Sequence, residues 1–553
     1  MLHFNLHFAD YGIISLYLLF VVGVGWLVKR QIKSSNDYLM SSHSIPLWIT
    51  SLAFISANLG AQEVIGMAAS GAKYGIMTSH FYWVGAIPAM VFMGVMMMPM
   101  YYGSKARTVP EYLKFRFDEK TRSVNAVSFG IMTVFSSGIS MYALARLLEA
   151  ILGWNFDMSV LLSAAIVMIY IFMGGLTSAV YNEVLQFFLI VFGIAPVVFV
   201  GLHEVGGWQG IVSKLPAQMT SSWKYMGDAS QNPMGVDTFS LVSGLGLAMS
   251  FGYWCTDFLV VQRAMISKNV SDGMKTPIFA AIPKMIMPFI VIFPGIIAVT
   301  LPHFTKDYVL PIAADGGPDY NMALPSLIAH YYPEGLLGVG LTALLASFMS
   351  GMAGNVTAFN AIWTFDIYQA YINKNASDNH YLYVGKITTV VGIVISIGVA
   401  YLANSFNNIN DFLQVVFSFF NGPIFATFFM GMFWKRATGH GAFAGLLGGT
   451  LAAAIVHGLT VAEGKGGWIA PLHHFGSGMS HAFNIAWIAF AANIVVTIVV
   501  SLLTKPKPES ELEGLIYGTT TLDFDGKSAW YLRPIPLAVM VTAACLMLNW
   551  IFA

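Results

Sequence analysis

The chain has 553 residues, of which 57% are hydrophobic and only 10% are charged, and its formal net charge is zero. Soluble domains carry about 25% charged residues, so the composition excludes an ordinary soluble protein and indicates an integral membrane protein. The balanced charge gives no reason to expect a nucleic-acid partner. Two cysteines, Cys255 and Cys545, stand inside apolar runs, which argues against a disulfide framework and a cysteine-based metal site.

Apolar runs of spanning length follow one another along the whole chain, since a membrane-spanning helix needs about 20 residues. We expect about 14 transmembrane helices, at 10–28, 46–70, 78–101, 124–151, 158–176, 181–203, 239–262, 277–301, 336–364, 384–404, 409–433, 440–461, 481–504 and 530–552. The polar stretches between these runs are too short for a separate catalytic domain. The sequence therefore predicts one all-α transmembrane domain over residues 1–553.

The second run contains a polar interruption, Ser56–Glu63. An Asn, a Gly and a Gln-Glu pair are unfavourable in the middle of a bilayer. A helix broken here would free backbone carbonyls, which are tolerated at membrane depth only where they line a cavity or hold a ligand. The alternative is a polar packing patch between helices.

A second interruption, Ser250–Asp257, opens another block of spans. The blocks 46–203 and 239–433 each hold five spans, and because five is odd, the blocks must have opposite orientations. Paired broken helices at corresponding positions of two inverted halves indicate a transport site. The helix at 10–28 and the three helices within 440–552 are then peripheral.

The distribution of Lys and Arg predicts the orientation in the membrane. If the N-terminus is outside, 20 of the 27 basic residues fall on the inner side, among them Lys527, and 5 fall on the outer side. We therefore expect a multi-pass protein of the cell membrane with both termini on the outer side.

Small and hydroxyl residues follow one face of the predicted helix 336–364, where Ser347, Ser350 and Gly354 share a side by helical spacing. One explanation is close packing, because small residues line the interfaces of membrane helices. The other is a sodium site. A hard monovalent cation is bound by several neutral oxygens, and carbonyls freed at Ser56 and Leu59 would add to these hydroxyls.

Several motifs resemble the sodium:solute symporter family, and in particular its members that transport galactose and glucose. They are Asn58–Met67, Asp37–Leu39, Ser44–Trp48, Thr108–Tyr112, Gly174–Leu176, Val261–Arg263, Thr364–Tyr368 and Gly431–Lys435. The resemblance extends from about residue 10 to the end of the chain. It implies the five-plus-five inverted-repeat fold of LeuT type, with a broken first helix in each repeat and alternating access coupled to Na⁺, and no other cofactor.

The resemblance also implies a sodium site. Its ligands would be the carbonyls of Ser56, Leu59 and Ser347 and the hydroxyl of Ser350. Gly351 stands where the family has a serine, so one hydroxyl ligand is missing, which either lowers the sodium affinity or leaves water or another group to fill its position. Glu183 stands where the family has Asp, near the exit path of the ion. The alternative for Glu183 is a solvated carboxylate at a helix start, favoured by the helix dipole.

The implied solute site is less uniform. Gln414, Lys284, Tyr253 and Trp254 match the galactose transporter, whereas Glu63, Tyr82, Ser250 and Gly85 stand where it has Gln, Glu, Asn and Ser. A buried lysine must be paired or face water, so Lys284 bonds either a solute hydroxyl or an intramembrane carboxylate. Tyr253 would stack under a sugar ring as an inner gate, or serve as an interhelical aromatic.

We therefore predict a sodium-coupled symporter that imports a small polar solute, and we favour a sugar or polyol. Its partners would be the solute, sodium and the bilayer, with no obligate protein partner. The alternatives are another solute (an amino acid, carboxylate or vitamin), or proton coupling through Glu63 and Glu183. A nutrient sensor is less favoured because no loop could hold a signalling domain. The sequence shows no nucleophile–base pair and no phosphate-binding loop, so we do not expect an enzyme.

Overall fold

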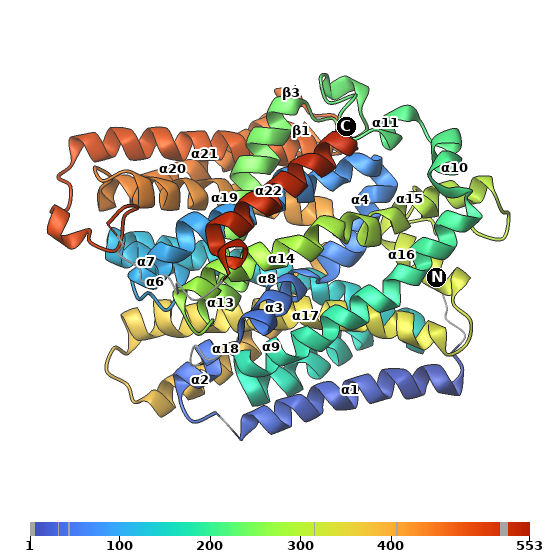
Figure 1. Ribbon diagram of the computed structural model, residues 1–553, viewed down its shortest axis with the longest axis horizontal. Helices are drawn as coiled ribbons and strands as arrows, with labels where there is room; N and C mark the ends of the chain where they lie inside the picture. The colour runs from blue at the N-terminus through green and yellow to red at the C-terminus, as the bar shows by residue number, and fades with distance from the viewer. Residues whose placement is uncertain are drawn as a thin grey trace.

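The computed structural model describes residues 6–30, 32–41, 45–313, 316–404, 408–519 and 529–552, without the side chain of Tyr170. Lys527, counted above among the inner basic residues, lies outside these ranges. Most of the long helices lie side by side and run along one common direction, with α1 (Phe8–Lys29) at one edge of the bundle and α20 (Gly439–Leu459) and α21 (Gly478–Leu503) at the opposite edge (Figure 1).

Within the described residues, 11 helical segments are long and apolar enough to cross a membrane. They are α1, Phe81–Gly103, α8 (Glu119–Leu152), Ile171–Glu204 of α9, Val270–His303, Leu336–Ile372, α18 (Asp378–Ala403), α19 (Ile409–Phe433), α20 (Gly439–Leu459), α21 (Gly478–Leu503) and α22 (Pro534–Ile551). Two bent helix pairs raise the number to 13. The described part of the chain is therefore a multi-pass membrane protein, as the sequence predicts.

The remaining expected span, 158–176, forms the first part of α9 (Phe156–Glu204), of which Phe156–Ile169 is a shorter apolar helix. The chain turns at Gly175, whose φ of 54° and ψ of −145° are not helical. A Cβ atom on Gly175 would lie 2.4 Å from the carbonyl oxygen of Tyr38 in α2 (Ser35–Met40). Only glycine fits this turn, because a side chain would meet both the strained backbone and α2.

The first predicted interruption is confirmed. Helix α3 (Leu47–Asn58) ends at Asn58, and the chain resumes as a π-helix at Gln62–Gly66 followed by α4 (Met67–Tyr74). The two parts are bent by 58°. Leu59 leaves the helical region with ψ of 38°, so polar backbone groups are freed here, in the interior of the bundle.

The second interruption is also present, but it lies at the end of the predicted stretch. A π-helix (Ser240–Ser250) continues into α12 (Phe251–Thr256), and the bend of 47° comes at Asp257, before α13 (Phe258–Met265). The Asp257 carboxylate accepts a hydrogen bond from the Leu259 amide (2.8 Å) and so caps α13.

The core helix α17 (Leu336–Ile362) packs against α3, α8 and α9, and α14 (Val270–Val291) packs against α3. Helices α5 (Ile87–Phe92) and α6 (Met98–Gly103) are parts of the span Phe81–Gly103, and α15 (Phe293–Thr300) is part of the span Val270–His303. The remaining short helices are α7 (Val109–Arg116), α10 (Gly207–Lys214), α11 (Ala217–Thr220) and α16 (Ala323–Tyr331). This arrangement leaves the two bent spans beside each other in the centre.

The expectation of a purely α-helical chain needs one correction. The connection between α20 and α21 forms a small sheet of three strands, β1 (Thr460–Ala462), β2 (Lys465–Gly466) and β3 (His473–His474), in the order β2-β1-β3. Strands β1 and β2 are antiparallel and are joined by Glu463 and Gly464, both with positive φ. A two-residue turn with positive φ matches the twist of a β-hairpin. The apolar pattern of the spans gives no indication of this hairpin.

Candidate functional site

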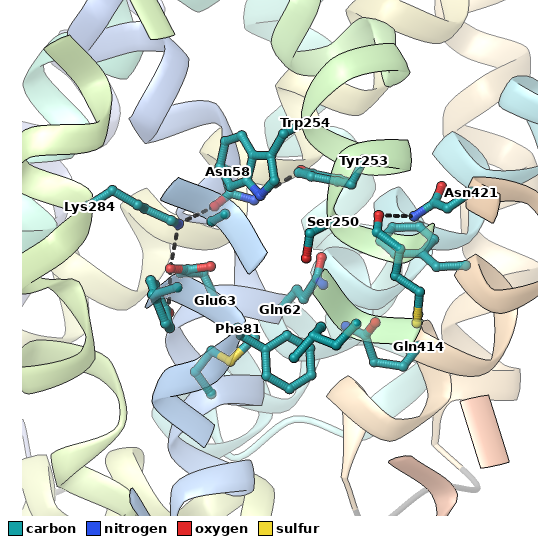
Figure 2. A pocket seen from close by; sticks show the side chains of 16 residues that line it. Asn58, Gln62, Glu63, Phe81, Ser250, Tyr253, Trp254, Lys284, Gln414 and Asn421 are labelled. Atoms are coloured by element: carbon teal, nitrogen blue, oxygen red, sulfur yellow. Dashed lines mark hydrogen bonds and ion pairs between the residues drawn. The ribbon is translucent and has the colours of Figure 1, made fainter. Parts of the chain in front are cut away.

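A pocket with about 450 Å³ of empty space, which includes space open to solvent, lies between the two bent spans (Figure 2). All seven predicted solute-binding residues line it: Glu63, Tyr82, Ser250, Tyr253, Trp254, Lys284 and Gln414. They come from five separate segments of the chain, which only the tertiary fold brings together. Asn58, Gln62 and Asn421 line it as well.

The ammonium group of Lys284 is the centre of the polar wall. Its Nζ lies 2.6 Å from Glu63 Oε1 and also donates to the side-chain carbonyl of Asn58 (Figure 2). The side chains of Lys284 and Glu63 are only 1% and 6% exposed. A buried charge is tolerated when it is paired and hydrogen-bonded, and here α14 supplies the cation while the segment after the first break supplies the anion.

Aromatic side chains surround this pair. The Tyr82 hydroxyl donates to Glu63 Oε1 (2.5 Å), and Lys284 Nζ lies 5.0 Å and 5.1 Å from the ring centroids of Tyr82 and Trp254. Both distances are within the range of cation–π attraction. The Asn58 amide donates to the Tyr253 hydroxyl (2.9 Å). The two bent spans are therefore tied to each other across the top of the cavity in Figure 2.

The opposite wall holds amides and apolar side chains. Gln414 donates to Asn410 (3.0 Å), and Asn421 donates to the Met249 carbonyl (3.2 Å). The Asn421 side-chain carbonyl is buried and accepts no hydrogen bond from any described residue. Met67, Phe81 and Phe417 contribute apolar surface. A polar acceptor facing apolar surface suits a ligand that carries both hydroxyl groups and a carbon skeleton.

The predicted sodium ligands meet at the end of α3. The Ser350 hydroxyl donates to the Ser56 carbonyl (3.0 Å), and the Ser347 hydroxyl donates to the Leu59 carbonyl (2.7 Å). All four residues are buried, with 0% exposure. The set consists of neutral carbonyl and hydroxyl oxygens, which is the chemistry that unwound helices offer to Na⁺. The residues present therefore fit this ion as cargo.

Gly351 lies in the same region and packs against Gly60, at the first break. A Cβ atom on Gly351 would lie only 2.8 Å from Gly60 Cα. α17 and the first bent span approach each other closely at position 351, and this contact leaves no room for a side chain there.

Glu183 is not a solvated carboxylate, so that alternative is wrong. Its Oε1 lies 2.6 Å from a terminal nitrogen of Arg263, and both side chains are 0% exposed. The Arg263 guanidinium also lies beside Gly354 of α17, 3.4 Å from the position of a Cβ atom there. Glu183 therefore stands within a buried ion pair next to the serine-bearing helix.

Some residues of this site were not among the predicted site residues. Asn58 and Gln62 belong to the first polar interruption, and their polarity in the middle of an apolar run indicates a functional position. Asn421 stands within an apolar run before Gly422 and Pro423, which is a weaker signal. Arg263 belongs to a motif of the resemblance, but nothing in the sequence pairs it with Glu183.

Another ion cluster, only partly buried, lies toward the far end of α4. Lys73 Nζ is 2.8 Å from both Asp411 Oδ2 of α19 and Glu463 Oε1 of the β1–β2 turn, and the Tyr74 hydroxyl donates to Asp411 (3.0 Å). We call these four residues the Lys73 cluster. It connects the second half of the first bent span to α19 and to the small sheet.

Comparisons with known proteins agree with this fold. A profile of the sodium:solute symporter family matches residues 38–449. The chain is 30% identical over 462 residues to a sodium/glucose cotransporter of Vibrio parahaemolyticus, covering 80% of this chain and 84% of that protein. It is 28% identical over 554 residues to sodium/glucose cotransporter 2 of Rattus norvegicus, covering 92% of this chain and 80% of that one.

Among solved structures, a Na⁺-coupled sialic acid symporter in a substrate-bound outward-open state has a TM-score of 0.76. The identity is 20%, and the match covers 90% of this chain and 99% of that chain. At this identity the likeness shows a shared fold. The family and these relatives are transporters, and the chain belongs to the sodium:solute symporter family.

Proposed function

We propose that the protein is a sodium-coupled symporter that imports a neutral, polyhydroxylated solute, a sugar or polyol, by alternating access. The observation that carries the proposal is the cavity between the two bent spans. It combines polar side chains that can bond a solute with an ion pair whose two charges balance each other. The glucose named for its cotransporter relatives belongs to this class of solute.

The charge balance supports a neutral solute over an amino acid or a carboxylate. Lys284 and Glu63 neutralise each other at 2.6 Å. A carboxylate solute would have to compete with Glu63 for Lys284 and would leave a buried anion without a partner, which is costly. A solute hydroxyl can donate and accept at once, and it can join the network without removing either charge.

The groups around the cavity have complementary roles in this proposal. Gln414, Asn421 and Ser250 would bond solute hydroxyls, while Glu63 and Lys284 would bond them from the opposite wall. The ring of Tyr253, held by Asn58 and lying 5.6 Å from the ring of Phe417, would cover the apolar face of the solute. A site built from such hydrogen bonds discriminates strongly against solutes that lack the matching hydroxyls.

Sodium would bind at Ser56, Leu59, Ser347 and Ser350, with the Glu183–Arg263 pair near its exit. Ion binding would hold the end of α3 against α17 and favour the state that receives the solute. Each sodium ion moved inward across a potential of about 100 mV would supply about 2.3 kcal/mol. Proton coupling is less well supported, since Glu63 and Glu183 are each paired with a base.

The architecture follows from the same proposal. Phe156–Ile169 would be the fourteenth span, residues 46–203 and 239–433 would form the two inverted repeats, and 10–28 and 440–552 would be peripheral. Both termini would lie outside. The Asp10 carboxylate accepts from the amide of Gly338, and the Ser222 hydroxyl donates to the carbonyl of Phe552, which supports placing both ends of the chain at outer connections.

Uptake into proteoliposomes tests the function. Purified protein is reconstituted, and accumulation of a labelled hexose or polyol is followed under an inward sodium gradient, an equal potassium gradient, or a pH gradient alone. Accumulation above equilibrium only with sodium supports the proposal. Accumulation driven by the pH gradient without sodium, or accumulation of amino acids and not of any neutral sugar or polyol, contradicts it.

A further inference from the structure

Position 351 has no room for a side chain that could carry a hydroxyl group. Gly351 is buried in α17, one residue after Ser350, and a Cβ atom there would lie 2.8 Å from Gly60 Cα and 2.9 Å from Ser140 Oγ. Real side chains do not approach backbone atoms so closely. A serine at 351 would therefore require α17 and the first bent span to move apart, and the position is restricted to glycine in this packing.

The Ser140 hydroxyl fills the place that a side chain at 351 would enter. Ser140 lies on α8, a third helix, and its Oγ is also 3.5 Å from the position of a Cβ atom on Gly60. The Ser140 oxygen therefore lies at the contact between Gly60 and Gly351, which are next in sequence to the predicted sodium ligands Leu59 and Ser350.

This hydroxyl also lacks a hydrogen bond. Ser140 is only 3% exposed, and no residue in the described part of the chain donates to its Oγ or accepts from it. Many serines in this protein's helices bond the carbonyl four residues earlier, as Ser163 and Ser396 do, but Ser140 does not, so its lone pairs remain available.

The neighbouring oxygens are the sodium ligands already described. Residues Leu59 and Ser350, adjacent in sequence to Gly60 and Gly351, contribute a carbonyl and a hydroxyl. Sodium prefers hard, neutral oxygen ligands. The Ser140 hydroxyl of α8 lies near these ligands and is the same chemical group as the serine hydroxyl that is missing at Gly351.

We propose that Ser140 Oγ is a sodium ligand of this protein and substitutes for the hydroxyl absent at Gly351. The inference rests on the proposed function, because it places Ser140 in the sodium site of that proposal. Sodium would then be held by three helices, with α8 joining α3 and α17.

The test is a sodium titration of purified protein without solute, read as the shift in thermal unfolding temperature at constant ionic strength with potassium as the replacement. Ser140→Ala is expected to weaken the apparent sodium affinity about tenfold or more. Ser140→Cys keeps the volume but offers a soft sulfur, so we expect it to unfold at a normal temperature and also to bind sodium weakly.

Ser137→Ala is the matched control. Ser137 lies one turn away on α8, is 1% exposed and also has an unpartnered hydroxyl, so removing it should leave the sodium response unchanged. If Ser140→Ala and Ser140→Cys titrate like the wild type while Ser350→Ala loses its response, the assignment of Ser140 is wrong and the sodium site stands. If the wild type itself shows no sodium-specific shift, the proposed function fails first.

Discussion

Lys284 Nζ and Glu63 Oε1 lie 2.6 Å apart and connect α14 to the π-helix that follows the first break, across one wall of the cavity. The positive charge inside the membrane is therefore balanced before any solute arrives. This relationship determines what the cavity can accept, because a solute must add hydrogen bonds to the pair without separating it.

Glu63→Gln should destabilise the protein, because Lys284 would keep a buried charge without its counter-ion. Breaking a buried ion pair by removing one partner costs about 3–5 kcal/mol. We expect a large fall in the thermal unfolding temperature and a loss of solute binding. The double variant Glu63→Gln, Lys284→Met should recover much of the stability while still failing to bind solute. A single variant as stable as the wild type would show that the pair is not maintained.

Gln414→Ala and Ser350→Ala should have opposite effects. Gln414 lines the cavity and Ser350 bonds the Ser56 carbonyl, so the first should weaken solute binding about tenfold, or about 1.4 kcal/mol, with sodium affinity nearly unchanged. Ser350→Ala should weaken sodium binding first. Separate titrations of solute and sodium check this, with expression and unfolding temperature as controls. If both variants lose only expression, the residues are structural.

Much of this site could be predicted from polarity alone. Asn58, Gln62 and Glu63 stand out in an apolar run, and the first break lies there. The second break was harder to locate. Gly252 suggests flexibility, but a Cβ atom there would lie 2.5 Å from Asn421, so this glycine allows close helix packing. The chain bends at Asp257, because that carboxylate can cap the next helix.

Contacts between distant segments could not be predicted from a single sequence. Glu183 pairs with Arg263 and Ser140 meets Gly351, and in each case the residues are far apart in the chain. The apolar pattern indicates which faces are buried but not which helices become neighbours. Lys284 is partly predictable. A lysine in a membrane span needs a partner or contact with water, but only the fold shows that this partner is Glu63.

The Lys73 cluster should hold one end of the cavity closed. Lys73 connects α4 to Asp411 of α19 and to Glu463. We expect Lys73→Gln to increase about tenfold the rate at which a cysteine introduced at Met67 reacts with a membrane-impermeant thiol reagent from outside. Cys255 and Cys545 are replaced first by serine.

The matched variant for this experiment is Glu463→Gln. The Glu463 side chain is 33% exposed whereas that of Asp411 is 7% exposed, and exposed ion pairs contribute little. Glu463→Gln should therefore change the labelling rate much less than Lys73→Gln. An unchanged rate in the Lys73 variant would rule out a closing role for the cluster.

Glu111, in α7 between two spans, should contribute a pH-dependent part of the stability. Burial raises the pKa of the Glu111 carboxyl, but hydrogen bonds and the charge of Arg107 outweigh it and hold the pKa below its usual range. The pKa of a glutamate carboxyl in the unfolded chain is about 4.3. The stabilisation is therefore present above that pH and is lost as the pH falls through the lower pKa of the folded state. Thermal unfolding of Glu111→Gln should show a shallower loss of stability on acidification than the wild type.

Sodium-dependent binding of a neutral solute is tested most directly by the dissociation constant of a sugar or polyol for purified protein, measured by calorimetry in sodium and in potassium at equal ionic strength. We expect a neutral polyhydroxylated solute to bind, sodium to tighten its binding by about tenfold or more, and acidic sugars and amino acids to bind far more weakly. Equal affinity in the two salts, or a clear preference for a charged solute, would contradict this expectation.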